Sequence, residues 1–228
     1  MTQPVLPSAI IDLRPGNPPP APDQGSRPTC LAMSITGAHD FLAAEAKEPS
    51  RAAEALWWSA VQMQGHARGT TLPVVRAALE QDGQPEDALW PYPTARLSPD
   101  PEQPPTSCGP SPWRVAAASA MDVRGSSFER DCEAHLAQGR PVVVIVQVTD
   151  EFAVPDPHGI IAVPARRAPS YGAHAVLVMG MRDIDVRGRY LIIRNSWGPH
   201  WGNAGYALLP LAYLATHGIQ AAVVHEPT

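Results

Sequence analysis

The stretch of sequence that decides the fold is RNSWGPHWGNAGY, residues 194–206. It separates two short apolar runs, residues 190–194 and 205–209, which predict two strands joined by a glycine-rich connection. Asn195 directly follows the first strand, so its side-chain amide is expected at the end of that strand. Two tryptophans, Trp197 and Trp201, lie beside it in the connection.

A histidine lies at the start of the preceding predicted strand. His174 is the second residue of the run AHAVLVM, residues 173–179, whose apolar composition is typical of a buried strand. If this strand is an antiparallel neighbour of 190–194, His174 and Asn195 fall at the same end of the sheet. Asn195 could then accept a hydrogen bond from one ring nitrogen of His174 and fix its tautomer and orientation.

A candidate nucleophile lies far upstream. Cys30 follows Pro28 and Thr29 at the start of a predicted helix over 30–46, where unpaired N–H groups and the helix dipole favour a thiolate. A lone cysteine is more often a small buried apolar residue, and its place at a helix start does not overturn that interpretation. Gln24, six residues upstream, adds an amide that can donate to a developing oxyanion beside the N–H of Cys30.

Three segments, in the same order along the chain, resemble the papain family of cysteine peptidases, which includes the cathepsins. They are DQGSRPTCLAMS, residues 23–34; GAHAV, residues 172–176; and NSWGPHWGNAGY, residues 195–206. Weaker similarities surround them, at Ile11–Arg14 and Trp90–Tyr92. The separation of 144 residues between the cysteine and the histidine fits the range of about 130–150 typical of such enzymes.

The resemblance implies a role for each of these residues. It makes Cys30 the nucleophile, His174 its base, Asn195 the residue that orients the base, and Gln24 an oxyanion donor. Trp197 would shield the His–Asn hydrogen bond from water. On this basis we expect hydrolysis of peptide bonds through a thioester acyl-enzyme, without a metal or an organic cofactor. Two alternatives are an amidase or transpeptidase-type acyl transfer on the same scaffold, and an inactive binding module.

The resemblance also suggests residues that bind the substrate. Gly69 and Thr70 lie where the family has a glycine-rich strip that pairs with the substrate backbone, although an ordinary turn explains them nearly as well. Ala173, next to the base, is small enough to leave room for a substrate side chain. Trp201 would line the leaving-group side together with Trp197, unless both are packing residues.

The segment around the nucleophile departs from the family in three places. Leu31 replaces a tryptophan, Pro28-Thr29 replaces glycine followed by serine or alanine, and Arg27 replaces a cysteine that forms a disulfide. None of these changes removes a catalytic atom. They indicate a divergent, disulfide-free branch and leave the substrate preference open. Arginine outnumbers lysine so strongly, with Lys47 the only lysine, that we expect a bacterial source.

The order of the predicted elements indicates an α+β protein with a papain-like two-lobe fold. Helices fill the first half: 30–46, one starting at 49–50, and one from 70–71 to 82–83. After eight prolines between Pro91 and Pro112 come a short helix, 128–137, and strands over 141–148, 173–179, 190–194 and 205–209. We expect one catalytic domain, 1–228, with a helical lobe over 21–112. The β lobe would comprise 113–228 and the N-terminal arm, 1–20.

Composition narrows the possible partners. The 228 residues are 44% hydrophobic and 17% charged, with a formal net charge of −5, so no basic surface for nucleic acid is indicated. No run of about 18 apolar residues predicts a membrane span. No signal peptide is visible, and we expect a cytoplasmic protein or one delivered by another route. The expected partner is a peptide or protein substrate, while an inhibitor, pro-segment or immunity-type partner stays unknown.

The cysteines do not suggest a metal site. Cys30, Cys108 and Cys132 form no CxxC pair, which favours three free thiols, although Cys108 could pair with Cys132. Cys132 and His135 share a helix face, but no second pair of ligands lies nearby.

Overall fold

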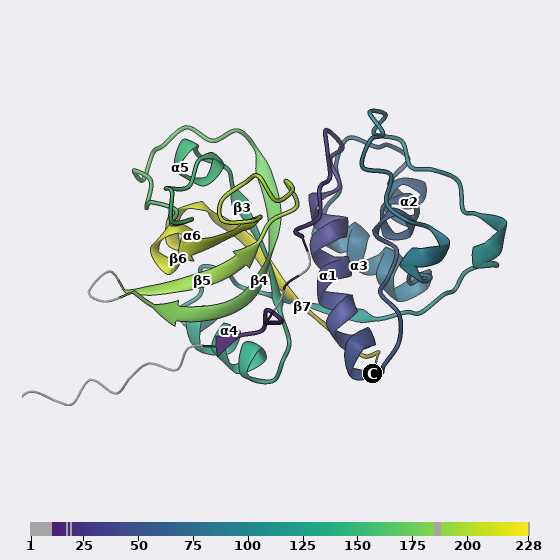
Figure 1. The fold of residues 1–228 in the computed structure, drawn as a ribbon, viewed down its shortest axis with the longest axis horizontal. Helices are drawn as coiled ribbons and strands as arrows, with labels where there is room; N and C mark the ends of the chain where they lie inside the picture. Colours follow the sequence, from purple (N-terminus) through teal and green to yellow (C-terminus); the bar gives the residue numbers. More distant parts are fainter. Residues whose placement is uncertain (1–10, 17, 19, 185–187, 228) are drawn as a thin grey trace, which may run out of the picture.

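Helix α1 (Cys30–Glu45) lies at the centre of the molecule, between a helical part and a sheet (Figure 1). The computed structural model describes residues 11–16, 18, 20–184 and 188–227. One side of α1 packs against α2 (Ala53–Gln64) and α3 (Leu72–Gln81), and the other side packs against the sheet. Its apolar residues Leu31 and Ile35 therefore belong to a core shared by helices and strands.

The four helices predicted from the sequence are present, and only the start of α2 differs; two further helices, Asp150–Ala153 and Leu211–His217, were not predicted. We expected α2 to begin at residues 49–50, whereas it begins at Ala53. The backbone N–H groups just before it bind acceptors outside the helix: the N–H of Arg51 donates to Asp40 Oδ1 at 2.7 Å, and the N–H of Ala52 donates to Pro85 O at 2.9 Å. Helix α3 has Pro73 in its first turn, where a missing N–H costs little.

The sheet contains seven strands, and the α+β class predicted from the sequence is confirmed. Its order is β2-β7-β3-β4-β5-β6, all neighbours are antiparallel, and β1 pairs with β4. The strands are β1 (Ile11–Asp12), β2 (Ala117–Met121), β3 (Val142–Gln147), β4 (Ala173–Asp183), β5 (Arg189–Arg194), β6 (Tyr206–Pro210) and β7 (Gly218–His225).

Both faces of the central strands are buried. Along β3, Val143 and Ile145 face the core that contains α1, whereas Val142, Val144 and Val146 face a second core. Helices α4 (Phe128–Ala137) and α6 (Leu211–His217) and the short α5 (Asp150–Ala153) pack on that second side. Burial on both faces explains why β3 reads as an unbroken apolar run rather than an alternating one.

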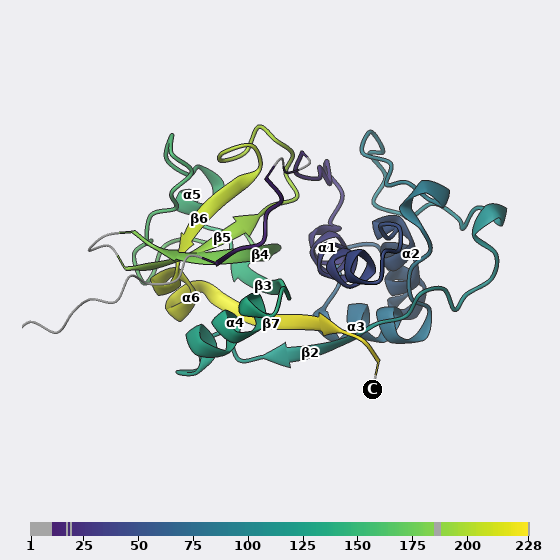
Figure 2. The same cartoon turned by 60° about the horizontal axis from the view of Figure 1, so that its bottom comes forward.

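Three strands, β1, β2 and β7, were not predicted from the sequence. β2 is the segment AASAM, whose alanines and serine have low strand propensity, and it forms by pairing with β7 along its whole length, from Ala117–His225 to Met121–Ala221. Figure 2 shows β2 and β7 extending beneath α1 and α3. This pair therefore joins the sheet to the helical part.

The proline-rich segment after α3 covers the helical part before the chain reaches β2 (Figures 1 and 2). A 3-10 turn, η1 (Asp87–Leu89), precedes this segment, and a second one, η2 (Thr106–Cys108), lies within it. The carbonyl of Pro99 accepts a hydrogen bond from the indole of Trp57 on α2 at 2.9 Å. We propose that one lobe comprises residues 21–112 and that the other comprises residues 113–228 together with the arm 1–20. Some residues of this second lobe lie outside the described residues.

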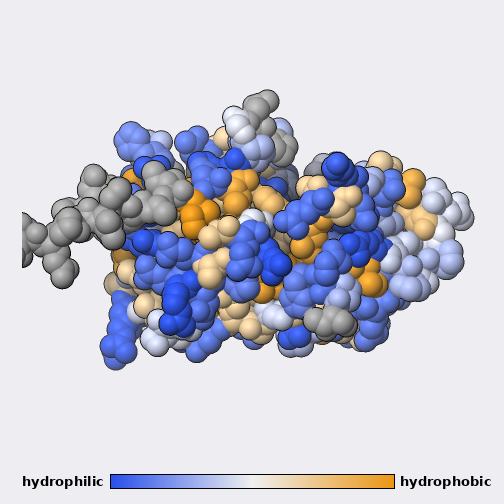
Figure 3. Space-filling view, turned by 90° about the horizontal axis from the view of Figure 1, so that it is seen from below, coloured by the Kyte–Doolittle hydropathy of each residue, from blue (hydrophilic) through white to orange (hydrophobic). Residues whose placement is uncertain are grey.

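The face of the molecule shown in Figure 3 is mostly hydrophilic, with apolar side chains scattered in small groups. No described helix is long and apolar enough to cross a membrane. Cys30, Cys108 and Cys132 are all free thiols.

Replacing Asp40 by asparagine is expected to stabilise the protein at pH 7. Burial raises the pKa of Asp40 to about 6, against an ordinary value of 3.8, so the folded state binds this proton more tightly than the unfolded state. The cost of ionising Asp40 is fully present above pH 6 and disappears below 3.8. Since Asp40 keeps some contact with solvent, we expect a gain of about 1 to 2 kcal/mol at neutral pH.

Chemical denaturation at neutral pH and at about pH 3.5 measures this effect, because the gain should vanish once the carboxyl is protonated in both states. The side-chain oxygen of the introduced asparagine can still accept the hydrogen bond from Arg51. The exposed Glu80, changed to glutamine, is the control and should leave stability unchanged at both pH values. A loss of stability in the Asp40→Asn variant at neutral pH would contradict the prediction.

Candidate active site

Four of the five predicted catalytic residues line one cleft, of about 900 Å³, between the start of α1 and the ends of β3, β4 and β5, and the fifth, Asn195, is buried beside it. Gln24, Cys30, His174 and Trp197 all line it. One group of further lining residues comes from the end of α2 and the following loop: Gln64, His66, Arg68, Gly69, Thr70 and Thr71. On the opposite wall lie Val148, Ala153, Tyr171 and Ala173.

The histidine and the asparagine are placed by neighbouring antiparallel strands, as the sequence predicts. Leu177 of β4 pairs with Arg194 of β5, so Asn195, at the end of β5, comes next to His174 near the start of β4. Nε2 of His174 lies 2.6 Å from Oδ1 of Asn195. That oxygen also accepts the N–H of Ser196 at 2.8 Å, so the histidine must be the donor, with its proton on Nε2. Nδ1 is then left free to accept a proton.

Aromatic rings enclose this hydrogen bond. The ring centroid of Trp197 lies 4.5 Å from that of His174, and Phe152 lies edge-on to both rings, at 5.7 and 5.9 Å. His174 and Asn195 are 4% and 1% exposed. A hydrogen bond shielded from water in this way holds the imidazole more firmly than an exposed one. Phe152 was not identified from the sequence, where it is one apolar residue after a strand.

Trp201 does not occupy the place we expected. It is absent from the described residues that line the cleft and packs behind Trp197, with ring centroids 5.8 Å apart. Its indole N–H donates to the carbonyl of Ala153 at 3.2 Å. The expectation that Trp201 contacts the substrate is therefore replaced by a packing role, because the glycine-rich connection turns its ring inward to the second core.

Cys30 lies at the first position of α1, and the N-cap residue Thr29 makes no side-chain capping bond. No acidic side chain occupies the first turn, so none competes with the thiol for the positive end of the helix dipole. Burial raises the pKa of the Cys30 thiol, while main-chain N–H groups of Ala175, Leu31 and Cys30 itself lower it. Ala175 is the neighbour of His174 on β4, and Cys30 and His174 line the same cleft.

Burial also lowers the pKa of His174, to about 4, although the hydrogen bond to Asn195 opposes the shift. The same desolvation therefore favours the neutral thiol and the neutral imidazole before a substrate binds. The two groups hold one transferable proton between them. Moving it from sulfur to Nδ1 creates a thiolate next to an imidazolium, and the attraction between these charges offsets part of the desolvation of each.

Gln24 is held by contacts on both ends of its side-chain amide. Oε1 accepts a hydrogen bond from the hydroxyl of Ser196 at 2.7 Å, and Nε2 donates to the carbonyl of Arg27 at 2.7 Å. An amide nitrogen carries two hydrogens, so one remains for the cleft, near the unpaired N–H groups at the start of α1. Ser196 was missed in the sequence analysis, although its place between Asn195 and Trp197 was a usable signal.

The residues predicted to bind the substrate lie on two walls of the cleft. Gly69 and Thr70 belong to the loop after α2, and Ala173 lies on the opposite wall. Gly69 has a φ of +105°, which favours glycine, and its carbonyl accepts a hydrogen bond from Gln64 at 2.7 Å. Arg68, which the sequence analysis passed over, adds an exposed positive charge to the same wall.

The described residues contain no group of three histidine, cysteine or acidic side chains that could hold a metal ion. Cys132, considered with His135, is fully buried in the second core, where burial raises its pKa to about 12. Its thiol is thus a packing group.

Comparison with protein families and curated proteins gives consistent matches. The model of the papain family cysteine proteases matches residues 8–226. Mouse pro-cathepsin H is 27% identical over 196 residues, which is 83% of this chain and 56% of that protein. Silicatein from Petrosia ficiformis is 30% identical over 91 residues, covering 40% of this chain and 26% of that one. The chain therefore spans little more than half the length of these curated relatives, or less.

Solved structures resemble the fold over nearly the whole chain. Xylellain, a cysteine protease from Xylella fastidiosa, has a TM-score of 0.80 and 22% identity, covering 96% of this chain and 86% of its own. A cysteine protease from Carica candamarcensis has a TM-score of 0.71 and 20% identity, covering 96% and 99%. At these identities the likeness establishes the fold.

Proposed function

Because the chain belongs to the papain family of cysteine proteases, we propose that it hydrolyses peptide bonds through a Cys30–His174–Asn195 site. The observation that carries the proposal is the 2.6 Å hydrogen bond from His174 to Asn195, buried under Trp197 in a cleft that Cys30 also lines. A buried, oriented imidazole next to a thiol is what an acyl transfer to sulfur requires.

In this mechanism His174 accepts the thiol proton at Nδ1 as the sulfur of Cys30 attacks the peptide carbonyl. The oxyanion that forms receives hydrogen bonds from the N–H of Cys30 and the free amide hydrogen of Gln24. His174 then gives its proton to the leaving amine, which departs and leaves a thioester. A water molecule, deprotonated by His174, attacks the thioester, and the thiol is regenerated.

The substrate is a peptide or protein segment in an extended conformation. Its main chain would lie along the wall that contains Gly69 and Thr70, where backbone groups are accessible because residue 69 has no side chain. Arg68 would favour an acidic side chain on that part of the substrate. The arginine-rich composition supports a bacterial source.

The proposal is tested by labelling with a thiol-reactive epoxide inhibitor, followed by cleavage of a diverse peptide library. Epoxide attached to Cys30 and cleavage products that carry one added water support a peptidase. Products that carry an added amine instead of water, when an amine is supplied, would replace hydrolysis by acyl transfer. No labelling at Cys30 and no cleavage would leave an inactive binding module and contradict the proposal.

The pH dependence of kcat/KM is expected to show an acidic limb near pH 4, since His174 has a pKa of about 4. Below it the imidazole is already protonated and cannot accept the thiol proton. At alkaline pH, above the raised pKa of Cys30, the proton is lost to solvent and none is left for the leaving amine. Activity should therefore extend over a broad range of pH. The acidic and the alkaline limit are properties of the coupled Cys30–His174 pair rather than of either residue alone.

Rates measured from about pH 3 to pH 10 check this expectation. In an Asn195→Ala variant the loss of a hydrogen bond that raises the pKa of His174 should move the acidic limb to still lower pH. An acidic limb at or above 6.5, the ordinary pKa of histidine, would contradict it.

A further inference from the structure

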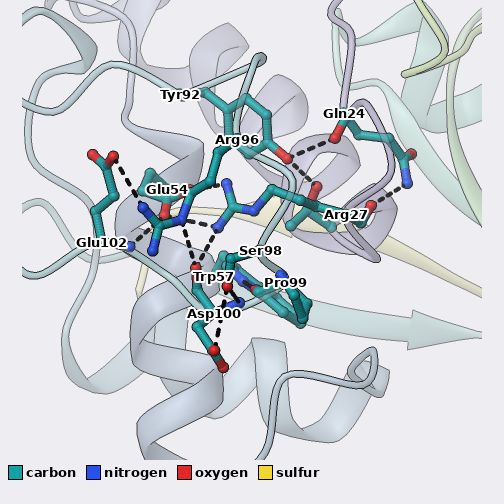
Figure 4. A network of polar contacts seen from close by, with 11 residues as sticks. Gln24, Arg27, Glu54, Trp57, Tyr92, Arg96, Ser98, Pro99, Asp100 and Glu102 are labelled. Atoms are coloured by element: carbon teal, nitrogen blue, oxygen red, sulfur yellow. Dashed lines mark hydrogen bonds and ion pairs between the residues drawn. The ribbon is translucent and has the colours of Figure 1, made fainter.

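A buried ion pair lies directly behind the segment that carries the nucleophile (Figure 4). Arg27, three residues before Cys30, faces Glu54 in the first turn of α2. Two parallel hydrogen bonds join them, Nη1 to Oε2 at 2.7 Å and Nη2 to Oε1 at 2.9 Å. Both side chains are 0% exposed, so the pair is removed from water.

The surroundings satisfy most of the remaining polar atoms. The N–H of Glu102 donates to Glu54 at 2.8 Å, and Arg27 also donates to the carbonyl of Asp100 at 3.4 Å. The guanidinium lies 5.0 Å from the centre of the Tyr92 ring. Taking two charges out of water is costly, and an apolar pair of similar volume often gives equal stability. Stability alone therefore does not account for this pair.

The main chain of Arg27 suggests what the pair does. Its carbonyl accepts two hydrogen bonds, one from Nε2 of Gln24 at 2.7 Å and one from the N–H of Thr29 at 2.9 Å. The first fixes the oxyanion donor, and the second shapes the entry to α1. Tyr92 closes the loop, because its hydroxyl donates to the carbonyl of Gln24 at 3.0 Å and lies 2.8 Å from the hydroxyl of Thr29.

We propose that Arg27 and Glu54 are positioning residues, whose ion pair fixes the loop 24–30 so that Gln24 and the N–H of Cys30 converge on one oxyanion. Arg27 connects the ion pair to the oxyanion donor, because its side chain binds Glu54 of α2 while its carbonyl accepts a hydrogen bond from the Gln24 amide (Figure 4). This inference rests on the proposed function, because it concerns the oxyanion of that same reaction.

The test compares two reactions of the same thiol. Acylation by an N-acyl amino acid p-nitrophenyl ester passes through an oxyanion, whereas alkylation by iodoacetamide does not. Glu54→Gln keeps the shape of the side chain and an acceptor for Glu102 but removes its charge. For that variant we expect the acylation rate to fall about 10- to 100-fold, with KM and the alkylation rate within about twofold of wild type.

A second variant covers the case in which an unpaired Arg27 prevents folding. The double change Arg27→Met with Glu54→Leu leaves no stranded charge, so the protein should fold, and we expect the same selective loss of acylation. The matched control is Glu226→Gln, which breaks the exposed pair of Arg114 and Glu226, joined at 2.6 Å, and should change neither rate.

The outcomes separate the two proposals. A folded variant that keeps the wild-type ratio of acylation to alkylation overturns the positioning role, and so does an equal fall in both rates. If wild-type protein is acylated by the ester but hydrolyses no peptide, the proposed function fails. The ratio across the variants then still decides whether Arg27 and Glu54 position the donors.

Discussion

Replacing Cys30 by alanine is expected to lower kcat for peptide hydrolysis by about 10⁴-fold or more, because no other group can form the thioester. Neither of the other two thiols lines the cleft, and Cys132 is enclosed in the second core. The change removes one sulfur atom from the first position of α1, so the fold should persist. Steady-state cleavage of a peptide from the library screen, with circular dichroism to verify folding, measures the effect.

Cys108→Ala is the matched control for this prediction. Cys108 is also a partly buried free thiol, but it lies in η2 of the proline-rich segment, outside the cleft. Its removal should leave kcat and KM unchanged and should not reduce epoxide labelling at Cys30. If the Cys30→Ala protein cleaves the peptide as fast as its parent, Cys30 is not the nucleophile.

Replacing Gln24 by alanine is expected to lower kcat by about 10²- to 10³-fold, the usual effect of removing one oxyanion donor. KM should change little, because this hydrogen bond strengthens as charge develops on the carbonyl oxygen in the transition state. The change also removes the acceptor of the Ser196 hydroxyl, so part of any effect could come through Ser196. Comparing kcat with the rate of alkylation by iodoacetamide isolates the oxyanion.

Ser196→Ala serves as the comparison for Gln24→Ala. It removes the bond that tethers Oε1 of Gln24 but leaves the donating nitrogen in place, so we expect a loss in kcat of about tenfold or less. Two results would contradict the assignment of Gln24 as a donor: an unchanged kcat in the Gln24→Ala variant, or a Gln24→Ala variant that differs from Ser196→Ala in KM but not in kcat.

The parts of the site that the sequence predicted are those set by local pattern and short connections. His174 and Asn195 each lie at the end of an apolar run, and two such runs in succession pair as antiparallel neighbours. Cys30 follows a proline and a threonine at the start of a helix, and Gln24 lies within the same short loop. Their positions, together with the resemblance of three ordered segments, predicted a common site: Gln24, Cys30 and His174 line one cleft, and Asn195 is buried beside it, hydrogen-bonded to His174.

The parts that the sequence analysis missed depend on contacts between distant segments. β2 is a strand only because β7 pairs with it, about a hundred residues downstream. Glu54 was not singled out from the sequence, and only its approach to Arg27 in the folded chain reveals a buried charge. Trp201 followed the same motif as Trp197, yet the turn between them directs one ring to the cleft and the other to the core.

The free thiols have a consequence for how the protein can be handled. Every link that fixes the loop before Cys30 is an ion pair, a hydrogen bond or a packing contact, and none is a sulfur–sulfur bond. A reductant that keeps Cys30 as a thiol therefore breaks no bond that holds this loop. Reducing conditions therefore act on the thiol of Cys30 without opening a cross-link elsewhere in the chain, since Cys108 and Cys132 are also free.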